Sequence, residues 1–240
     1  MPEALLQTVR LNLAGLIPAV FVRRPNRFLA EVLMEDGRRE RVHCPNSGSM
    51  KGCLEEGAPV RLSRAPSGRV RKTAYTWEMI KINGGWVGIN TQVPNELAAQ
   101  AAQKRAVPLF RNVHAVQREV AVGAHARMDL RAETSSGPLW VEVKNVTLVE
   151  DGTAFFPDAV TDRGTKHLDV LVDRVRCGEQ AAMFYVVQRT DARRFAPAAH
   201  IDPVYAERFR WARGEGVAVC VVQARVSPEA IVLERFLPFE

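Results

Sequence analysis

Two acidic residues and one lysine in the second half of the sequence have the residue types and spacing of a metal-dependent phosphodiesterase site. Glu142 and Lys144 are separated by one residue, and twelve residues lie between Asp129 and Glu142. Cleaving a phosphodiester requires a divalent metal held by hard oxygen ligands, and a cation that orients the attacking water or stabilises the developing negative charge. The three residues therefore predict catalysis on a nucleic acid with Mg²⁺ or Mn²⁺.

The triad lies on two segments that read as neighbouring strands, 127–132 and 139–146. Because side chains alternate across a strand, Glu142 and Lys144 are expected on one face of the sheet, with Asp129 beside them on the next strand. Glu142-x-Lys144 is the only acid-x-Lys triplet in the chain. A salt-bridged strand face exposed to solvent would show the same pattern, and this alternative stays open.

Two further groups extend the candidate site. Glu119 lies on another strand-like segment, 116–122, and is a candidate third acid. The helix predicted at 161–175 carries three cations at positions i, i+3 and i+4, which share one face: Arg163, Lys166 and His167. A cationic face beside carboxylates suits a phosphate substrate, so the three are DNA-binding candidates. A single histidine is more often a packed or surface residue, and this interpretation of His167 also stays open.

The remaining segments predict a mixed α+β protein of two domains, with a boundary at Gly84-Gly85. Residues 1–85 read as an OB-fold-like β-barrel, because one helix at 50–56 interrupts five strands at 18–23, 27–35, 39–44, 59–64 and 73–82. Residues 86–240 read as a mixed α/β domain. Its helices are expected at 95–103, 161–175 and 203–213, and its strands at 116–122, 127–132, 139–146, 182–187 and 217–224.

Positive charge is concentrated in the first domain. Residues 1–85 contain 14 Lys and Arg against 8 Asp and Glu, whereas residues 86–240 contain 19 of each class. The candidates gather at the two loops that flank the nucleic-acid groove of an OB fold, and they are Arg23, Arg24, Arg27, Arg64, Arg69, Arg71 and Lys72. This asymmetry predicts a DNA partner, duplex or single-stranded. Charge runs are often only solvated surface, which is the alternative.

Composition excludes several protein classes. No run approaches the roughly 18 apolar residues of a membrane span, and the N-terminus lacks the pattern of a signal peptide. The four cysteines form no C-x-x-C pair, which argues against a zinc site and fits reduced thiols: Cys44, Cys53, Cys177 and Cys220. A soluble, cytoplasmic protein without membrane contacts is the expectation.

Five segments run in order over nearly the whole chain: RPNRF at 24–28, HCPNSGSM at 43–50, NTQVPN at 90–95, VEVKNVTL at 141–148 and FPDAVTDRGTKHL at 156–168. They resemble the sugar fermentation stimulation protein A (SfsA) family. The resemblance implies a DNA-binding protein with an N-terminal OB-like domain and a C-terminal domain similar to the PD-(D/E)xK nucleases. It also implies that Asp129, Glu142 and the carbonyl of Val143 bind Mg²⁺, and that Lys144 is the catalytic cation.

The sequence departs from the nuclease pattern at one position. Met128 precedes Asp129, so the Pro-Asp pair that names the superfamily is absent, although only the acid takes part in the chemistry. Pro157-Asp158 follows the triplet and is expected to cap a helix. The polar residues before the helix at 50–56 are expected either to cap it or to offer hydroxyls and amides to a phosphate: Asn46, Ser47 and Ser49.

Two functions compete. The first is a metal-dependent nuclease that holds DNA on its basic barrel, and the second is a non-catalytic DNA-binding regulator of sugar (maltose) metabolism genes, as the family's name implies. The presence of Asp129, Glu142 and Lys144 favours the enzyme, although such folds can keep the triplet and lose activity. No base-reading motif is evident, so DNA binding is expected to be largely independent of sequence. A homodimer would let one site per chain cut both strands.

Overall fold

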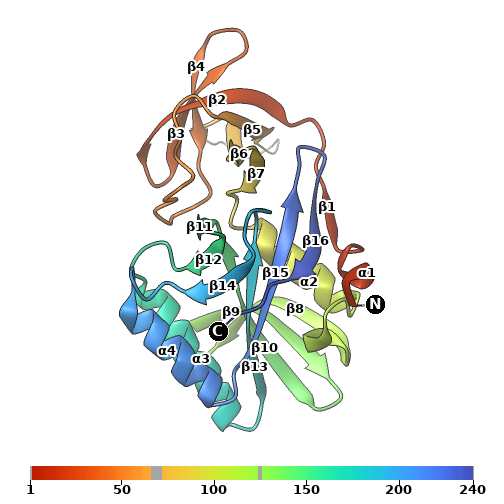
Figure 1. Cartoon of the computed structure of the whole chain (residues 1–240). Coiled ribbons are helices and arrows are strands. Elements are labelled where there is room, and N and C mark those ends of the chain that lie inside the picture. Colours follow the sequence, from red (N-terminus) through yellow and green to blue (C-terminus); the bar gives the residue numbers. More distant parts are fainter. Residues whose placement is uncertain (1, 66–71, 124–125, 240) are drawn as a thin grey trace.

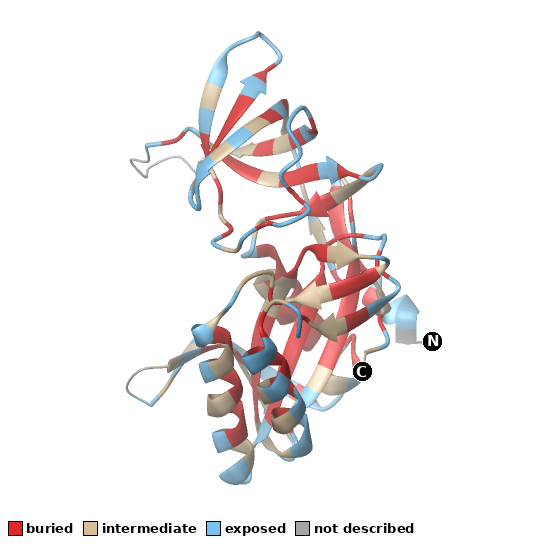
Figure 2. Ribbon diagram, turned by 60° about the vertical axis from the view of Figure 1, so that its left-hand side comes forward, coloured by how far each residue is buried: buried red, intermediate tan, exposed pale blue. Residues whose placement is uncertain are grey.

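The protein consists of a small β-barrel domain stacked on a larger α/β domain (Figure 1). The computed structural model describes residues 2–65, 72–123 and 126–239. Buried side chains fill the barrel and both faces of the main sheet, whereas the outer faces of the helices are exposed (Figure 2). None of the helices in the described residues is long and apolar enough to cross a membrane. The mixed α+β fold expected from the sequence is confirmed.

The N-terminal domain is a closed barrel. Its sheet has the strand order β4-β3-β2-β5-β6-β7, and its strands are β2 (Ile17–Asn26), β3 (Leu29–Met34), β4 (Arg39–His43), β5 (Pro59–Arg64), β6 (Tyr75–Ile82) and β7 (Gly85–Gly88). An additional pairing between β4 and β6, at His43 and Thr76, closes five of these strands into the barrel. Phe21 and Trp77 stack in its core with ring centroids 5.0 Å apart. The expected OB-fold-like barrel is therefore present.

The prediction of a helix at 50–56 is wrong. Met50 and Gly52 have φ angles of 56° and 76°, in the left-handed region that interrupts a right-handed helix. The segment forms turns instead, and the backbone N of Cys53 donates to the carbonyl of Met50 at 2.9 Å. Met50 and Cys53 are buried in the barrel core, so the apolar spacing that resembled a helix face comes from core packing.

The C-terminal domain is built on a mixed seven-stranded sheet. Its strands, in spatial order, are β1 (Arg10–Asn12), β16 (Ala230–Phe236), β15 (Ala218–Val226), β13 (Gln180–Val187), β10 (Gly137–Val146), β9 (Ala126–Thr134) and β8 (Val113–Val122). The central strands β10, β13 and β15 are parallel, and the outer pairings are antiparallel. A smaller sheet consists of β11 (Leu148–Glu150), β12 (Thr153–Phe156) and β14 (Arg194–Pro197).

Helices cover both faces of the seven-stranded sheet (Figure 1). One face packs against α1 (Pro2–Leu6), α2 (Val93–Gln103) and the short 3₁₀ helix η1 (Pro108–Phe110), and the other against α3 (Asp162–Arg176) and α4 (Pro203–Gly214). Thr161 caps α3 by accepting a hydrogen bond from the Gly164 N, and Asp202 caps α4 by accepting from the Tyr205 N. Both helices start close to where the sequence predicts.

The expected division into residues 1–85 and 86–240 differs from the structure at both ends of the barrel domain. Strand β1 pairs with β16, so the first residues belong to the C-terminal sheet. Strand β7 pairs with β6, so the barrel continues beyond Gly85. A three-residue strand carries too little periodicity to reveal a partner more than 200 residues away, which explains the difference at the N-terminus.

Candidate functional site

Strands β9 and β10 separate at Asp129. Their pairing ends at Leu130 and Val141. Beyond this point the Asp129 Oδ2 accepts a hydrogen bond from the backbone N of Val143 at 2.8 Å, and its Oδ1 accepts one from the Asn95 Nδ2 at 2.9 Å. The carboxylate of Asp129 therefore takes the place of a strand partner in the fork between the two strands.

The carboxylate of Glu142 is buried on β10, with 3% of its side chain exposed. Its Oε1 accepts a hydrogen bond from the Lys144 Nζ at 2.5 Å and contacts the His167 Nδ1. Its Oε2 is buried and has no hydrogen-bond partner among the described residues. Because a buried carboxylate oxygen is unfavourable without a partner, this atom is available to a ligand.

Helix α3 places His167 against this carboxylate. The Nε of Arg163 donates to the His167 Nε2 at 3.3 Å, and an arginine can only donate. The Nε2 therefore accepts, the ring proton lies on Nδ1, and Nδ1 donates to the Glu142 Oε1. In this tautomer the ring cannot accept from Lys144, whose Nζ lies 3.3 Å from the Nδ1. Of the three ammonium hydrogens of Lys144, only one has an acceptor in the described part of the chain.

The pKa values of the two carboxylates shift in opposite directions. Burial and, after it, the negative charge of Glu142 raise the pKa of Asp129 to about 6, although the hydrogen bond from the Val143 N acts to lower it. Burial also acts to raise the pKa of Glu142, but Lys144 and His167 outweigh it, so the pKa of Glu142 is lowered. A divalent cation between the two carboxylates would relieve the repulsion that raises the pKa of Asp129.

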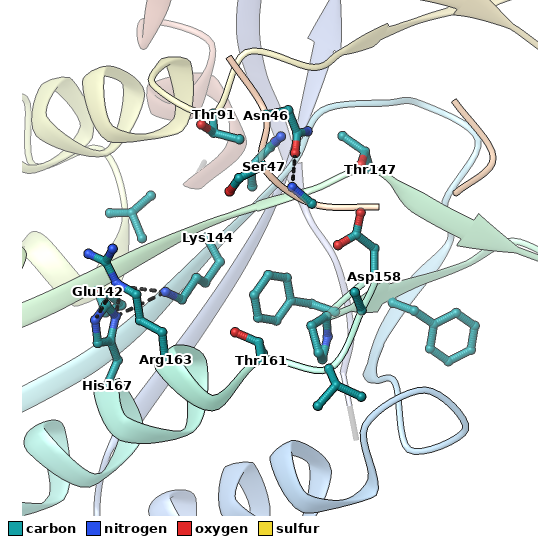
Figure 3. A pocket seen from close by; sticks show the side chains of 18 of the residues that line it. Asn46, Ser47, Thr91, Glu142, Lys144, Thr147, Asp158, Thr161, Arg163 and His167 are labelled. Carbon is teal, nitrogen blue, oxygen red and sulfur yellow. Dashed lines mark hydrogen bonds and ion pairs between the residues drawn. The ribbon is translucent and has the colours of Figure 1, made fainter. Parts of the chain in front are cut away.

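A cavity of about 460 Å³ opens over these residues and is lined by both domains (Figure 3). The α/β domain contributes Asp129, Glu142, Lys144, Arg163 and His167. The barrel contributes Arg27 and part of residues 44–50, which we call the barrel loop. The structure thus brings the acid-x-Lys triplet, the fork aspartate and two of the three predicted helix cations into one site.

Asp158 joins the barrel loop to the segment before α3. Its Oδ2 accepts from the backbone N of Met50 at 2.8 Å, and its carbonyl accepts from the Ser49 Oγ at 2.6 Å. The approach is so close that a Cβ on Gly48 would lie 2.7 Å from the Asp158 Oδ1. The expected helix-capping role of Asp158 is therefore wrong, because Thr161 caps α3. No periodic pattern in the sequence signals a contact of this kind between two loops.

The polar residues of the barrel loop also lack the expected helix to cap. Asn46 accepts from the Gly48 N at 2.8 Å and donates to the Ile89 carbonyl at 3.2 Å. The hydroxyl of Ser49 donates to the Asp158 carbonyl, while Ser47 lines the cavity. Asn46 and Ser47 therefore form part of the wall of the site, and the alternative contact of Asn46, Ser47 and Ser49 with a phosphate stays a prediction.

The structure does not bring Glu119 into the site. Its side chain is 54% exposed, forms an ion pair with Arg127 at 3.9 Å, and does not line the cavity. The fork between β9 and β10 opens on the opposite side of β9 from β8, because the strand order is β10-β9-β8. Glu119 is therefore not a third acid of this site.

The predicted DNA-binding cations have diverse environments. The guanidinium of Arg24 donates to four backbone carbonyls, and that of Arg23 forms an ion pair with Glu31 at 2.6 Å. His167 is only 8% exposed and bound to Glu142, so it is not a surface contact. Six candidates are exposed: Arg23, Arg27, Arg64, Lys72, Arg163 and Lys166. Arg69 and Arg71 lie outside the described residues.

The donors at the fork fit a divalent cation with oxygen ligands. No cluster of three or more His, Cys, Asp or Glu residues with metal-binding geometry occurs in residues 2–65, 72–123 and 126–239. The available protein donors are the carboxylates of Asp129 and Glu142, with Val143 lining the same cavity. Mg²⁺ commonly uses one or two carboxylates and keeps several waters, so this small donor set suits it.

Two family models match consecutive parts of the chain. The SfsA N-terminal OB domain matches residues 22–89, and the sugar fermentation stimulation protein RE domain matches residues 92–230. A sugar fermentation stimulation protein homolog of Geotalea daltonii is 46% identical over 93% of this chain and 96% of its own length. The homolog of Pelobacter propionicus is 47% identical over 95% of this chain and 99% of its own length.

A solved structure has the same architecture. SfsA of Pyrococcus furiosus, determined in complex with Ca²⁺, superimposes with a TM-score of 0.88 at 26% sequence identity. The match covers 96% of this chain and 98% of that protein. Both domains and their arrangement are therefore shared with that protein.

Proposed function

This chain belongs to the sugar fermentation stimulation protein (SfsA) family, and from that premise we propose that it is a DNA-binding protein with a Mg²⁺-dependent nuclease site. The observation that carries the proposal lies at the fork between β9 and β10, in the cavity that Asp129 and Lys144 line. There the Oε2 of Glu142 is buried and has no hydrogen-bond partner within the described part of the chain. The complex of Pyrococcus furiosus SfsA with Ca²⁺ supports the proposal, because it shows that this relative binds a divalent cation.

The carboxylates of Asp129 and Glu142 would hold Mg²⁺ together with the carbonyl of Val143. When bound, this ion supplies positive charge and Lewis acidity at a phosphate oxygen. Lys144 has two ammonium hydrogens to donate to the attacking water or to a non-bridging phosphate oxygen. His167 acts as a positioning residue, because its Nδ1 holds the Oε1 of Glu142 and leaves the Oε2 for the ligand.

Cations at the rim of the cavity support a polyanionic substrate. Arg27 reaches it from the barrel and Arg163 from α3, and the exposed Lys166 lies on the next turn of the same helix. DNA binding through such backbone contacts is sensitive to salt and depends little on sequence. The experiment that tests the function is incubation of labelled DNA with the protein in Mg²⁺ and in EDTA. Binding in both conditions without cleavage would favour the non-catalytic regulator.

A metal bound at the fork should stabilise the fold. At a metal concentration of 100 times Kd, binding to the native state alone contributes about 2.7 kcal/mol, which raises the Tm by roughly 5 to 10 °C for a chain of this size. Thermal unfolding with and without Mn²⁺ measures the shift. We expect it in the wild type and in Glu119→Gln, whose side chain lies outside the cavity. An equal shift in Glu142→Gln would place the metal elsewhere.

Removal of the His167 imidazole should reduce kcat more than it changes KM. Of the two described residues that contact the Glu142 carboxylate, His167→Ala leaves Lys144, and loss of such a supporting contact lowers activity by roughly 10- to 100-fold. His167→Asn places an amide N–H near the position of the Nδ1 and should recover part of the loss. Steady-state cleavage rates measure both effects. If Ala and Asn behave alike, or if only KM changes, His167 does not position Glu142.

A further inference from the structure

Hydrogen bonds between distant segments close a circuit around the cavity. The Thr91 Oγ1 donates to the Pro45 carbonyl at 2.8 Å, which joins the barrel loop to the segment before α2. At its other end the barrel loop is joined to the segment before α3 by the two hydrogen bonds with Asp158. Asn95 then links α2 to Asp129, and His167 links α3 to β10. Both domains therefore enclose the site on all these sides.

The enclosure limits which substrates reach the carboxylates. The cavity of about 460 Å³ has the size of a site for one small ligand, and only 3% of the Glu142 side chain is exposed on its floor. Figure 3 shows Asn46, Ser47 and Thr91 on one side of the opening, with Asp158 and Thr161 on another. A duplex cannot enter this space without the extrusion of a nucleotide from the stack, whereas an unpaired strand avoids that penalty.

An exposed aromatic residue lies in the same tight turn of the barrel as a cavity-lining arginine. Phe28 follows the cavity-lining Arg27 in sequence and is 59% exposed, although phenylalanine is usually buried. Its backbone is fixed, because its N donates to the Asn26 Oδ1 at 2.9 Å and its carbonyl accepts from the Cys44 N at 2.9 Å. Proteins that bind single-stranded nucleic acid combine basic residues with exposed aromatic rings on which bases stack.

We propose that the site accepts an unpaired nucleic-acid strand in preference to a duplex. A phosphate enters the cavity, Arg27 and Arg163 contact the backbone on either side of it, and Phe28 stacks on a base outside. This inference rests on the proposed function, because it names the substrate class of the same site. The stacking contact depends on the π-face that every base has, so single-stranded DNA and RNA both fit it.

Strand preference can be measured without cleavage. Fluorescence anisotropy of the wild-type protein in EDTA compares a labelled single strand, its blunt duplex and the same duplex with a single-stranded overhang. We expect the single strand and the overhang to bind roughly tenfold or more tightly than the blunt duplex. An RNA strand of the same sequence is the second arm, and a preference for either unpaired strand over duplex supports the proposal.

Phe28→Ala should weaken single-strand binding by roughly 5- to 100-fold and leave duplex binding nearly unchanged. Leu33→Ala is the matched control, because Leu33 is an exposed apolar residue of the same barrel that does not line the cavity. Duplex binding as tight as single-strand binding, or no effect of Phe28→Ala, would overturn the proposal. Cleavage in Mg²⁺ is measured separately. If the protein prefers the single strand but does not cleave it, the proposed nuclease activity is wrong and the proposed strand preference holds.

Discussion

Replacement of Glu142 by Gln is expected to lower Mg²⁺-dependent DNA cleavage by roughly a thousandfold or more, with DNA affinity largely retained. Gln keeps the size of the side chain and can still accept from Lys144. It removes the negative charge that would hold the metal beside Asp129. Because the carboxylate is buried at the floor of the cavity and the cations are at the rim, catalysis and binding are expected to separate.

The measurement is the initial rate of cleavage of a labelled DNA in Mg²⁺, with affinity measured in parallel in EDTA. Lys144→Ala should cause a comparable loss. Among the described residues only Lys144 and His167 contact the Glu142 Oε1, and of these two Lys144 is the cation. Glu119→Gln is the control and should retain full activity, since Glu119 lies outside the cavity. Full cleavage by Glu142→Gln would contradict the site, and no cleavage by the wild type would favour the regulator.

The sequence predicts the centre of the site well because two simple periodicities encode it. Alternation along β10 places Glu142 and Lys144 on the face of α3, while Val141 and Val143 pack on the face of α2. Helical periodicity places Arg163 and His167 on one face of α3. Each pattern is local, so each is readable without knowledge of the tertiary structure.

The sequence does not predict the surroundings of the site, because they depend on contacts between distant loops. Asp158 is separated from Met50 by more than 100 residues, and Asn95 from Asp129 by 34. Glu119 shows the opposite error, in which the sequence predicts a site residue that the structure excludes. Its place on a neighbouring strand is not enough to bring its side chain into the site. Its orientation depends on a left-handed backbone at φ 54°, which composition does not reveal.

Arg24 provides the strongest test of this difference between local pattern and tertiary contact. Sequence alone assigns it to the DNA-binding surface, because it lies in a basic turn of the barrel. In the structure its Nη1 donates to the carbonyls of Gly48 and Ser49, at 2.9 and 3.3 Å. Its Nη2 donates to the carbonyls of Arg27 and Asn46, at 2.9 and 2.5 Å. One guanidinium therefore fixes the barrel loop that walls the cavity.

Arg24→Ala is expected to lower the free energy of unfolding by about 2 to 4 kcal/mol, because four backbone carbonyls lose one shared charged donor. The Tm should fall by roughly 5 to 15 °C for a chain of this length. Arg24→Lys should recover little, because a single ammonium cannot reproduce the planar fork that reaches several carbonyls at once. Denaturant and thermal unfolding, each followed by circular dichroism, measure the loss.

Arg23→Ala is the matched control in the adjacent position. Its side chain is 66% exposed, and its partner Glu31 keeps a second cation, Arg41, at 3.5 Å when Arg23 is removed, so the Tm should stay nearly unchanged. If Arg24 acts as a DNA contact instead, Arg24→Ala will keep the wild-type Tm and lose affinity, as a surface cation would. A lowered Tm accompanied by a loss of cleavage would show that this residue acts through the barrel loop, since the loop forms one wall of the catalytic cavity.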